Sequence, residues 1–245
     1  MAGFKTHIGT STTLGIAYGS AGLFLLPQTD GQLPIASCLL AAGLCSVGGM
    51  LPDLDSDSGI PLRETVAFTA AIVPMLLIHR LAHLGLSHEM MVVTGGLSYL
   101  LIRFGFFSLL KKYTVHRGMF HSIPAAVIAA LLAFLLCTCE TAPPRYFKAG
   151  AVFLGFMSHL VLDELWSIEW KRGRWKLKQS FGTALKLWGN NTFANFSTYL
   201  KLAVLAAMAF ADPIVMERIE NHLHRGKDVP RIAIENIEKI QNIWK

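Results

Sequence analysis

Long stretches without a charged side chain are the feature that most restricts the fold of this chain. Residues 33–51 contain no charged residue, residues 8–27 are small and apolar, and residues 122–139 are almost wholly Ala, Leu, Ile and Val. A helix that crosses a bilayer needs about 20 apolar residues, with a usable range of about 17 to 25. The sequence therefore predicts at least three transmembrane helices.

The composition agrees with a membrane protein. Apolar residues make up 53% of the chain and charged residues 16%, whereas soluble proteins carry about 25% charged residues. This hydrophobicity excludes intrinsic disorder. The 22 Lys and Arg residues outnumber 16 Asp and Glu residues, but they lie between apolar runs and in no nucleic-acid-binding motif, so we expect no nucleic-acid partner.

Four further apolar segments are interrupted by polar or proline residues: 65–79, 90–110, 146–166 and 199–216. The first and the last of these could cross the membrane, re-enter it or lie buried among other helices. We therefore expect five to seven crossings. The predicted fold class is all-α, a polytopic transmembrane helical bundle of five to seven crossings.

The distribution of Lys and Arg predicts the orientation of this bundle. With the amino terminus in the cytoplasm, the inner stretches hold most of the basic residues, including the segment 171–178, while the outer loops hold Arg80, Arg145 and Lys148. We expect residues 1–216 to form the bundle, with an interfacial or cytoplasmic basic segment. Residues 217–245 carry Ile at roughly helical spacing, which predicts an amphipathic tail helix on the membrane, on a partner or in solvent.

The four cysteines do not predict a disulfide framework or a metal site. Cys38 and Cys45 lie in one apolar run, and Cys137 and Cys139 in another. The CxC spacing differs from the CxxC spacing of zinc and redox sites, so we expect all four to pack as small hydrophobic side chains.

Ionisable residues in or beside apolar runs indicate a functional role, because inserting a charged side chain at the bilayer centre costs about 2.5 to 3.5 kcal/mol. Asp53 and Asp55 directly follow Pro52, which stops a helix. In an extended turn alternate residues point the same way, so both carboxylates could face one ion. An acidic turn without a ligand is the alternative.

Two further groups contain histidine. His116 and His121 are five residues apart, with Gly118 between them to allow an irregular turn that brings both imidazoles to one centre. His159 and Asp163 are four residues apart, which places both on one helical face. The alternatives are histidines without a shared role and a His–Asp hydrogen bond that packs helices.

The predicted topology joins these groups. All three fall at cytoplasmic helix ends, and His7 lies at the start of the first helix, so we predict one metal centre. Mixed His and Asp ligands suit a divalent metal, Zn or Mn foremost, and the number of ligands is compatible with a dinuclear site. The predicted metal ligands are His7, Asp53, Asp55, His116, His121, His159 and Asp163.

These motifs carry a family resemblance. Thr-His-Ile at 6–8, Pro-Asp-Leu-Asp at 52–55, His-Arg-Gly-Met-Phe-His-Ser at 116–122 and His-Leu-Val-Leu-Asp at 159–163 together resemble a bacterial inner-membrane, LexA-regulated family of metal-dependent hydrolases. The similarity spans roughly the first two-thirds of the chain. It implies a multi-pass protein of the inner (cytoplasmic) membrane with a metal site made from those histidines and aspartates. Phe120 departs from the HRGxTHS pattern, in which a small or hydroxyl residue is expected.

A metal-bound water provides hydroxide near neutral pH, so hydrolysis is the chemistry that such a site predicts. Basic residues around it would attract anions, and phospholipid is the nearest supply. We therefore expect a hydrolase of a phosphoester in a lipid or lipid-linked substrate, with Asp55, His121 and Arg117 as catalytic residues and Arg117 as the phosphate contact. The alternatives are an ion or solute transporter and a non-catalytic scaffold with a structural metal. Membrane lipid is the expected partner, and a homo-oligomer is compatible with the sequence.

Overall fold

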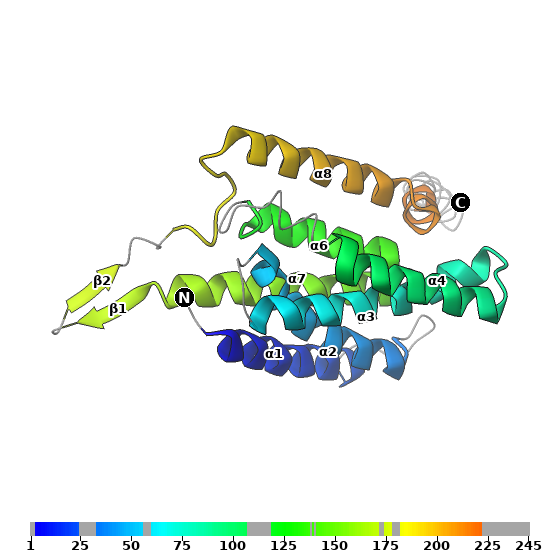
Figure 1. The fold of residues 1–245 in the computed structure, drawn as a ribbon, viewed down its shortest axis with the longest axis horizontal. Helices are drawn as coiled ribbons and strands as arrows, with labels where there is room; N and C mark the ends of the chain where they lie inside the picture. Colours follow the sequence, from blue (N-terminus) through cyan, green and yellow to red (C-terminus); the bar gives the residue numbers. More distant parts are fainter. Residues whose placement is uncertain are drawn as a thin grey trace, which may run out of the picture. The chain divides into compact units, whose positions relative to one another are not determined.

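The computed structural model describes residues 3–24, 33–55, 60–106, 119–137, 139, 141–171, 174–177 and 182–221. Their regular secondary structure is helical apart from one two-stranded β-hairpin (Figure 1). In chain order the elements are α1 (Phe4–Phe24), α2 (Ile35–Gly48), the 3₁₀ helix η1 (Leu51–Asp55), α3 (Ile60–His83), α4 (His88–Leu100), the π-helix η2 (Leu101–Phe106), α6 (Ile123–Leu136), α7 (Ala142–Leu165), β1 (Ile168–Lys171), β2 (Arg174–Leu177) and α8 (Thr192–Phe210).

The chain divides into two compact units, Met1–Ala206 and Ala207–Lys245. In the second unit the structure describes the end of α8 and a helix over residues 213–221. Asp212 begins that helix, because its Oδ1 accepts a hydrogen bond from the Ile214 backbone N–H at 3.2 Å. Most of the predicted tail helix, residues 222–245, lies outside the described residues, so the expected division into 1–216 and 217–245 stays a prediction.

Close contacts between small residues hold α1, α2 and α7 together in the first unit. A Cβ added at Gly15 would overlap the carbonyl oxygen of Ala42, and one at Gly155 would overlap that of Cys45. Membrane helices approach closely where small residues let their backbones meet. Gly155 lies one turn before His159, so this contact fixes the position of the carboxyl-terminal part of α7 against α2.

Three small buried clusters form the core between α1, α2, α3, α6 and α7. One joins Leu44 and Ala133 to Val152, and another joins Ala126 to Phe156 and Leu160. Cys38, Cys45 and Cys137 are buried free thiols. The sequence prediction that these cysteines pack as small hydrophobic side chains agrees with this arrangement.

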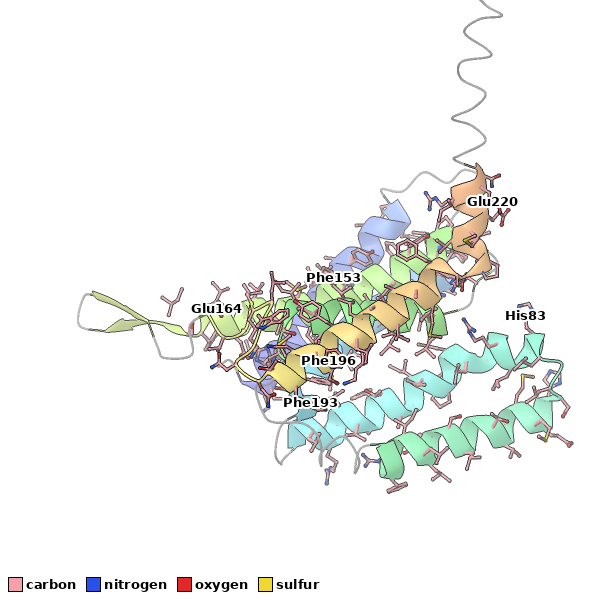
Figure 2. The ribbon with its side chains drawn as sticks, turned by 90° about the horizontal axis from the view of Figure 1, so that it is seen from above. His83, Phe153, Glu164, Phe193, Phe196 and Glu220 are labelled. Carbon is pink, nitrogen blue, oxygen red and sulfur yellow. The ribbon has the colours of Figure 1, made fainter. Side chains whose placement is uncertain are left out.

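Large apolar side chains cover the outer surfaces of α3, α4 and α8. No residue of α4 is buried, and Val92 on α4 is 74% exposed. Figure 2 shows the α3–α4 pair ending at the labelled His83, with side chains projecting from both helices. Contiguous apolar surface of this extent marks a contact with membrane or protein rather than with water.

Two helices among the described residues are long and apolar enough to cross a membrane, Leu62–His83 and Thr192–Phe210. The apolar helices α2 and α6 have 14 residues each and are shorter than a full crossing. They are shorter than the apolar runs that contain them: α2 begins after Pro34 and ends at Gly48, and α6 begins after the Ser122 cap and ends at Leu136. The number of crossings, expected as five to seven, stays a prediction.

The basic segment after α7 forms a β-hairpin rather than an irregular stretch. Ile168 pairs with Leu177 and Lys171 with Arg174 across the antiparallel strands. Ile and Trp favour strands, and Trp170 and Trp175 occupy directly opposed positions. The expectation of an all-α chain is therefore correct for the bundle and needs this hairpin added.

Candidate metal centre

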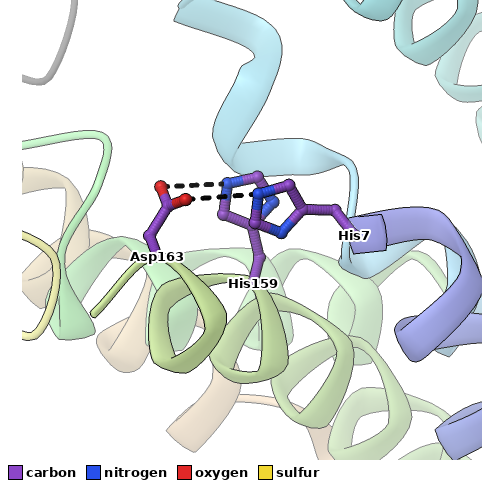
Figure 3. Close-up of side chains that lie close together, drawn as sticks. All are labelled: His7, His159 and Asp163. Atoms are coloured by element: carbon purple, nitrogen blue, oxygen red, sulfur yellow. Dashed lines mark ion pairs between the residues drawn. The ribbon is translucent and has the colours of Figure 1, made fainter. Parts of the chain in front are cut away.

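Histidine and aspartate side chains from four separate segments meet at one end of the bundle. His7 comes from the first turns of α1, Asp53 from η1, and His121 from the turn before α6. His159 and Asp163 come from the last two turns of α7. Neighbouring helices run in opposite directions, so the start of one and the end of the next reach the same level. Figure 3 shows His7, His159 and Asp163 together.

The carboxylate of Asp163 lies between two imidazoles. His7 Nε2 is 3.2 Å from Asp163 Oδ1, and His159 Nε2 is 3.7 Å from Asp163 Oδ2. The rings of His7 and His159 stack with their centroids 3.7 Å apart and their planes 11° from parallel. This stacking directs the Nε2 atoms of both rings toward the same carboxylate.

A second group shares His159 with the first. His159 Nε2 lies 3.7 Å from Asp53 Oδ1, and the His121 ring meets the His159 ring edge to face at 5.6 Å between centroids. The ligand atoms of Asp53, His121 and His159 all lie within 4.8 Å of one another, as do those of His7, His159 and Asp163. The five side chains therefore form one cluster built around His159.

The backbone carbonyl of Gly49 orients His159. Its oxygen lies 2.8 Å from His159 Nδ1, and because a carbonyl oxygen can only accept, Nδ1 carries the proton. Nε2 is then the unprotonated nitrogen of the neutral ring and faces both aspartates. Metal-binding histidines in proteins commonly donate their other ring N–H to a carbonyl or carboxylate in this way.

Hydroxyl side chains join α1 to α2 beside the cluster. Ser11 is fully buried, and its Oγ donates to the carbonyl oxygen of Ser46 at 3.2 Å. The hydroxyls of Thr12 and Ser46 are 2.6 Å apart. Gly49 lies against the Ser11 side chain so closely that a Cβ at Gly49 would overlap it. These contacts hold the first turns of α1, and His7 with them, against the end of α2.

A local cap positions His121. The Ser122 hydroxyl accepts the Ala125 backbone N–H at 3.4 Å and donates to the Met119 carbonyl oxygen. Ser at the N-cap with Pro124 in the first turn is a strong signal for a helix start. The turn 119–122 is thereby closed, and His121 is 2% exposed.

The cluster fits a divalent cation. His159 Nε2, which faces both aspartates, is buried and has no hydrogen-bond partner among the residues that the structure describes. The donor-to-donor distances of 3.2 to 3.7 Å resemble the edge of about 3.3 Å between ligands that surround an ion tetrahedrally at about 2.0 Å. The two aspartates and the unprotonated imidazole nitrogen are the ligand types that such an ion takes. A buried carboxylate also needs a compensating charge, which a cation would supply.

The structure brings together five of the seven predicted ligands. These are His7, Asp53, His121, His159 and Asp163. His116 and the predicted phosphate contact Arg117 lie outside the described residues, as does the Asp55 side chain. The role of all seven as metal ligands stays a prediction.

The expected geometry around Asp53 and Asp55 is wrong. The sequence indicated an extended turn in which both carboxylates share a face, whereas Leu51–Asp55 forms a 3₁₀ helix. That helix has about three residues per turn, so the two-residue alternation of an extended segment does not apply to it. Pro52 is the second residue of this short helix, a position that it can occupy because proline is compatible with the first turn of a helix.

Sequence reasoning missed two groups that position the cluster. The Gly49 carbonyl gives no side-chain signal, although the Gly48-Gly49 pair before Pro52 indicates close backbone approach. The sequence around Glu164 does not distinguish a structural role from that of a solvated charge. The Glu164 carboxylate accepts the backbone N–H groups of Gly182 and Ala184, the latter at 3.4 Å, and so holds the chain after the hairpin.

Comparison with known proteins assigns the chain to a family. No curated protein and no solved structure matches it. Residues 1–174 match the family described as YdjM inner membrane protein, and this range contains every residue of the cluster. The match confirms the resemblance to an inner-membrane family over the first two-thirds of the chain, whereas LexA regulation and hydrolysis stay predictions. The chain belongs to the YdjM inner membrane protein family, which places it in the inner membrane.

Proposed function

We propose that this protein is a membrane-embedded, metal-dependent hydrolase. Its substrate would be a phosphoester in a lipid or lipid-linked molecule at the cytoplasmic face of the membrane. The observation that carries the proposal is the convergence of five buried or half-buried His and Asp side chains from four distant segments, in two groups that share His159 and whose ligand atoms lie within 4.8 Å of one another. Chance packing would rarely place so many ionisable groups together in an apolar bundle, because each costs energy to bury.

The residues of the cluster have distinct tasks in this proposal. His159, oriented by Gly49, and Asp163, flanked by His7, would hold a Zn or Mn ion. His121 and Asp53 would complete the site for one ion or for two, with Asp55 and His116 as further predicted ligands. When bound, the cation supplies a Lewis acid and lowers the pKa of a water molecule toward neutrality.

The burial of the cluster indicates the side from which a substrate would approach. The His159 side chain is 0% exposed and that of Asp163 is 4% exposed, whereas that of Asp53 is 18% exposed. Water and substrate therefore have access at Asp53. Asp55 and His121 would touch the substrate there, and Arg117 would bind its phosphate through a bidentate guanidinium contact.

The burial also favours one alternative, a scaffold with a structural metal. Structural sites are closed by protein ligands, whereas catalytic sites keep an open position, and His7, His159 and Asp163 are almost completely buried. An ion or solute transporter has less support, because it needs ionisable groups at several depths, and these five lie at one end of the bundle.

Metal analysis of the purified protein is the first test. We expect wild-type protein in detergent to retain bound Zn or Mn by elemental mass spectrometry, and His159→Ala to lose most of it. Ser158→Ala is the matched control, because Ser158 precedes His159 on α7 and, among the described residues, its hydroxyl hydrogen-bonds within its own helix, to the Gly155 carbonyl. A wild-type protein that binds no metal would end the proposal.

Hydrolysis is the second test and separates the enzyme from the scaffold. We expect release of phosphate or headgroup from inner-membrane lipid extract by wild-type protein with added Zn or Mn, and loss of release in Asp53→Asn. If the metal is bound and its removal lowers the melting temperature, but no lipid is cleaved, the structural alternative is correct.

A further inference from the structure

The segment that follows the β-hairpin, residues 182–191, is here called the strap. It connects the β-hairpin to α8 without forming a helix or a strand. The sequence motifs of the metal centre do not include it, and it lies outside the range that matches the family. Its contacts with the rest of the first unit nevertheless link it to the metal centre.

Hydrogen bonds attach the strap to both helix ends that carry the cluster. Glu164, the residue after Asp163, accepts the backbone N–H groups of Gly182 and Ala184. The Lys186 carbonyl accepts the backbone N–H of Ile123, two residues after His121, at 3.1 Å. The strap therefore bridges the end of α7 and the start of α6, and it lies at the level of the metal centre.

The strap is equally well attached to the start of α8. The buried Asn195 side chain accepts from the Gly189 N–H and donates to the Gly189 carbonyl, both at 2.8 Å. The Tyr199 hydroxyl donates to the Leu187 carbonyl at 2.8 Å, and the Tyr199 ring lies 4.9 Å from that of Trp188. The start of α8 and the strap thus form one well-bonded structure.

The outer face of this structure is apolar. Trp188 is 65% exposed and Leu187 59%, and on the first turns of α8 Phe193 is 78% and Phe196 66% exposed. Figure 2 labels Phe193 and Phe196 on the first turns of α8 and Glu164 at the end of α7. A tryptophan and several large apolar side chains beside a lysine, Lys186, are typical of the membrane–water interface.

The length of α8 fixes the depth of the strap. Its 19 residues, which are together apolar enough to cross a membrane, span about 28 Å at 1.5 Å per residue, close to the hydrocarbon thickness of about 30 Å. If α8 crosses the membrane, its first residue, Thr192, lies at one interface, and the strap ends at the residue before it. The headgroup region is then the environment of the strap's exposed apolar side chains.

From these contacts we infer that the strap and the first turns of α8 are an interfacial anchor, which inserts Leu187, Trp188 and Phe193 among phospholipid headgroups and sets the metal centre at headgroup depth. The occupant of this apolar face is the lipid bilayer. The inference concerns position in the membrane and holds whether or not the metal centre is catalytic.

Depth-dependent fluorescence quenching in nanodiscs that hold one copy of the chain tests this inference. In a variant with Trp188 as the sole tryptophan, made by Trp→Phe at 166, 170, 175 and 244, we expect a larger loss of emission with lipid brominated near the carbonyl end of the acyl chain than near its terminal methyl. In a second variant with Trp166 as the sole tryptophan, this residue, three positions after Asp163, reports the depth of the metal centre. We again expect stronger quenching by the lipid brominated near the carbonyl end.

The matched control is Val204→Trp in the tryptophan-free chain, because Val204 is exposed in the middle of α8. This tryptophan should be quenched more strongly by the lipid brominated near the terminal methyl. If neither lipid quenches Trp188 and its emission is red-shifted, the side chain lies in water. If neither lipid quenches it and its emission is blue-shifted, protein covers the side chain. Either result, or stronger quenching by the deep bromines, overturns the inference. If the multiple Trp→Phe variant misfolds, broadening of the Trp188 resonance by spin-labelled lipid in 5-fluorotryptophan wild-type protein gives the same readout.

Discussion

His159 Nδ1 donates a hydrogen bond to the carbonyl oxygen of Gly49 across 2.8 Å, so a residue at the end of α7 takes its orientation from the backbone at the end of α2. The two residues are 110 positions apart in the sequence. The bond fixes the proton on Nδ1 and leaves Nε2 facing Asp53 and Asp163. The geometry of the proposed metal centre therefore depends on how closely α2 and α7 pack.

Gly49→Ala should weaken metal binding without removing a ligand. The new Cβ would overlap the Ser11 side chain and displace the Gly49 carbonyl from His159. Loss of such a supporting hydrogen bond typically costs about 10- to 100-fold in metal affinity, to be measured by competition with a fluorescent chelator. Gly43→Ala is the control, because nothing lies within 4 Å of a Cβ there. Equal affinities for the two variants would contradict the orienting role of Gly49.

Gly155→Ala should destabilise the bundle. The added methyl group would overlap the Cys45 carbonyl, and overpacking of this kind costs about 1 to 3 kcal/mol or more. The measurement is the melting temperature in detergent, compared with Gly96→Ala on α4, where the structure shows open space for a Cβ. A variant at 155 that is as stable as the variant at 96 would show that α2 and α7 are not in close contact.

Glu164→Ala should loosen the strap. The carboxylate accepts two backbone N–H groups, and hydrogen bonds to a charged group contribute about 1.5 to 3 kcal/mol each. We expect faster proteolytic cleavage between residues 182 and 191 than in wild type. Glu89→Ala removes an exposed acid from the first turn of α4 and should leave the cleavage rate unchanged. Unaltered cleavage in Glu164→Ala would mean that other contacts hold the strap.

The predicted orientation can be tested with single cysteines in a cysteine-free chain. Leu84→Cys lies in the exposed turn between α3 and α4, and Thr183→Cys lies in the strap. Because the basic residues predict a cytoplasmic amino terminus, an impermeant maleimide added to intact cells should label position 84 but not 183. Permeabilised cells should allow labelling at both positions. The reverse pattern in intact cells would place the metal centre on the opposite side of the membrane.

Much of the candidate site could be predicted because its residues have helical spacing or lie at the ends of apolar segments. His159 and Asp163 are one helical turn apart, and the structure keeps that relationship. The basic residues predicted that His7, Asp53 and His121 lie at the same level, and the structure brings them together. The extended turn at Asp53 and Asp55 was wrong, because a proline that ends one helix can also start a short 3₁₀ helix, and local sequence does not distinguish the two.

The sequence by itself determined which segments are apolar, which ends carry imidazoles and carboxylates, and the family. The length of an apolar segment and the positions of charged residues can be obtained directly from the sequence. In a membrane protein they predict which segments form helices and on which side of the membrane each helix end lies. Only the tertiary structure decided which His159 nitrogen faces Asp163, and that Glu164 and Asn195 hold the strap beside the metal centre. These relationships depend on backbone carbonyls, backbone N–H groups and the absence of a Cβ at glycine. Every residue has such backbone groups, so the sequence does not reveal where two of them meet.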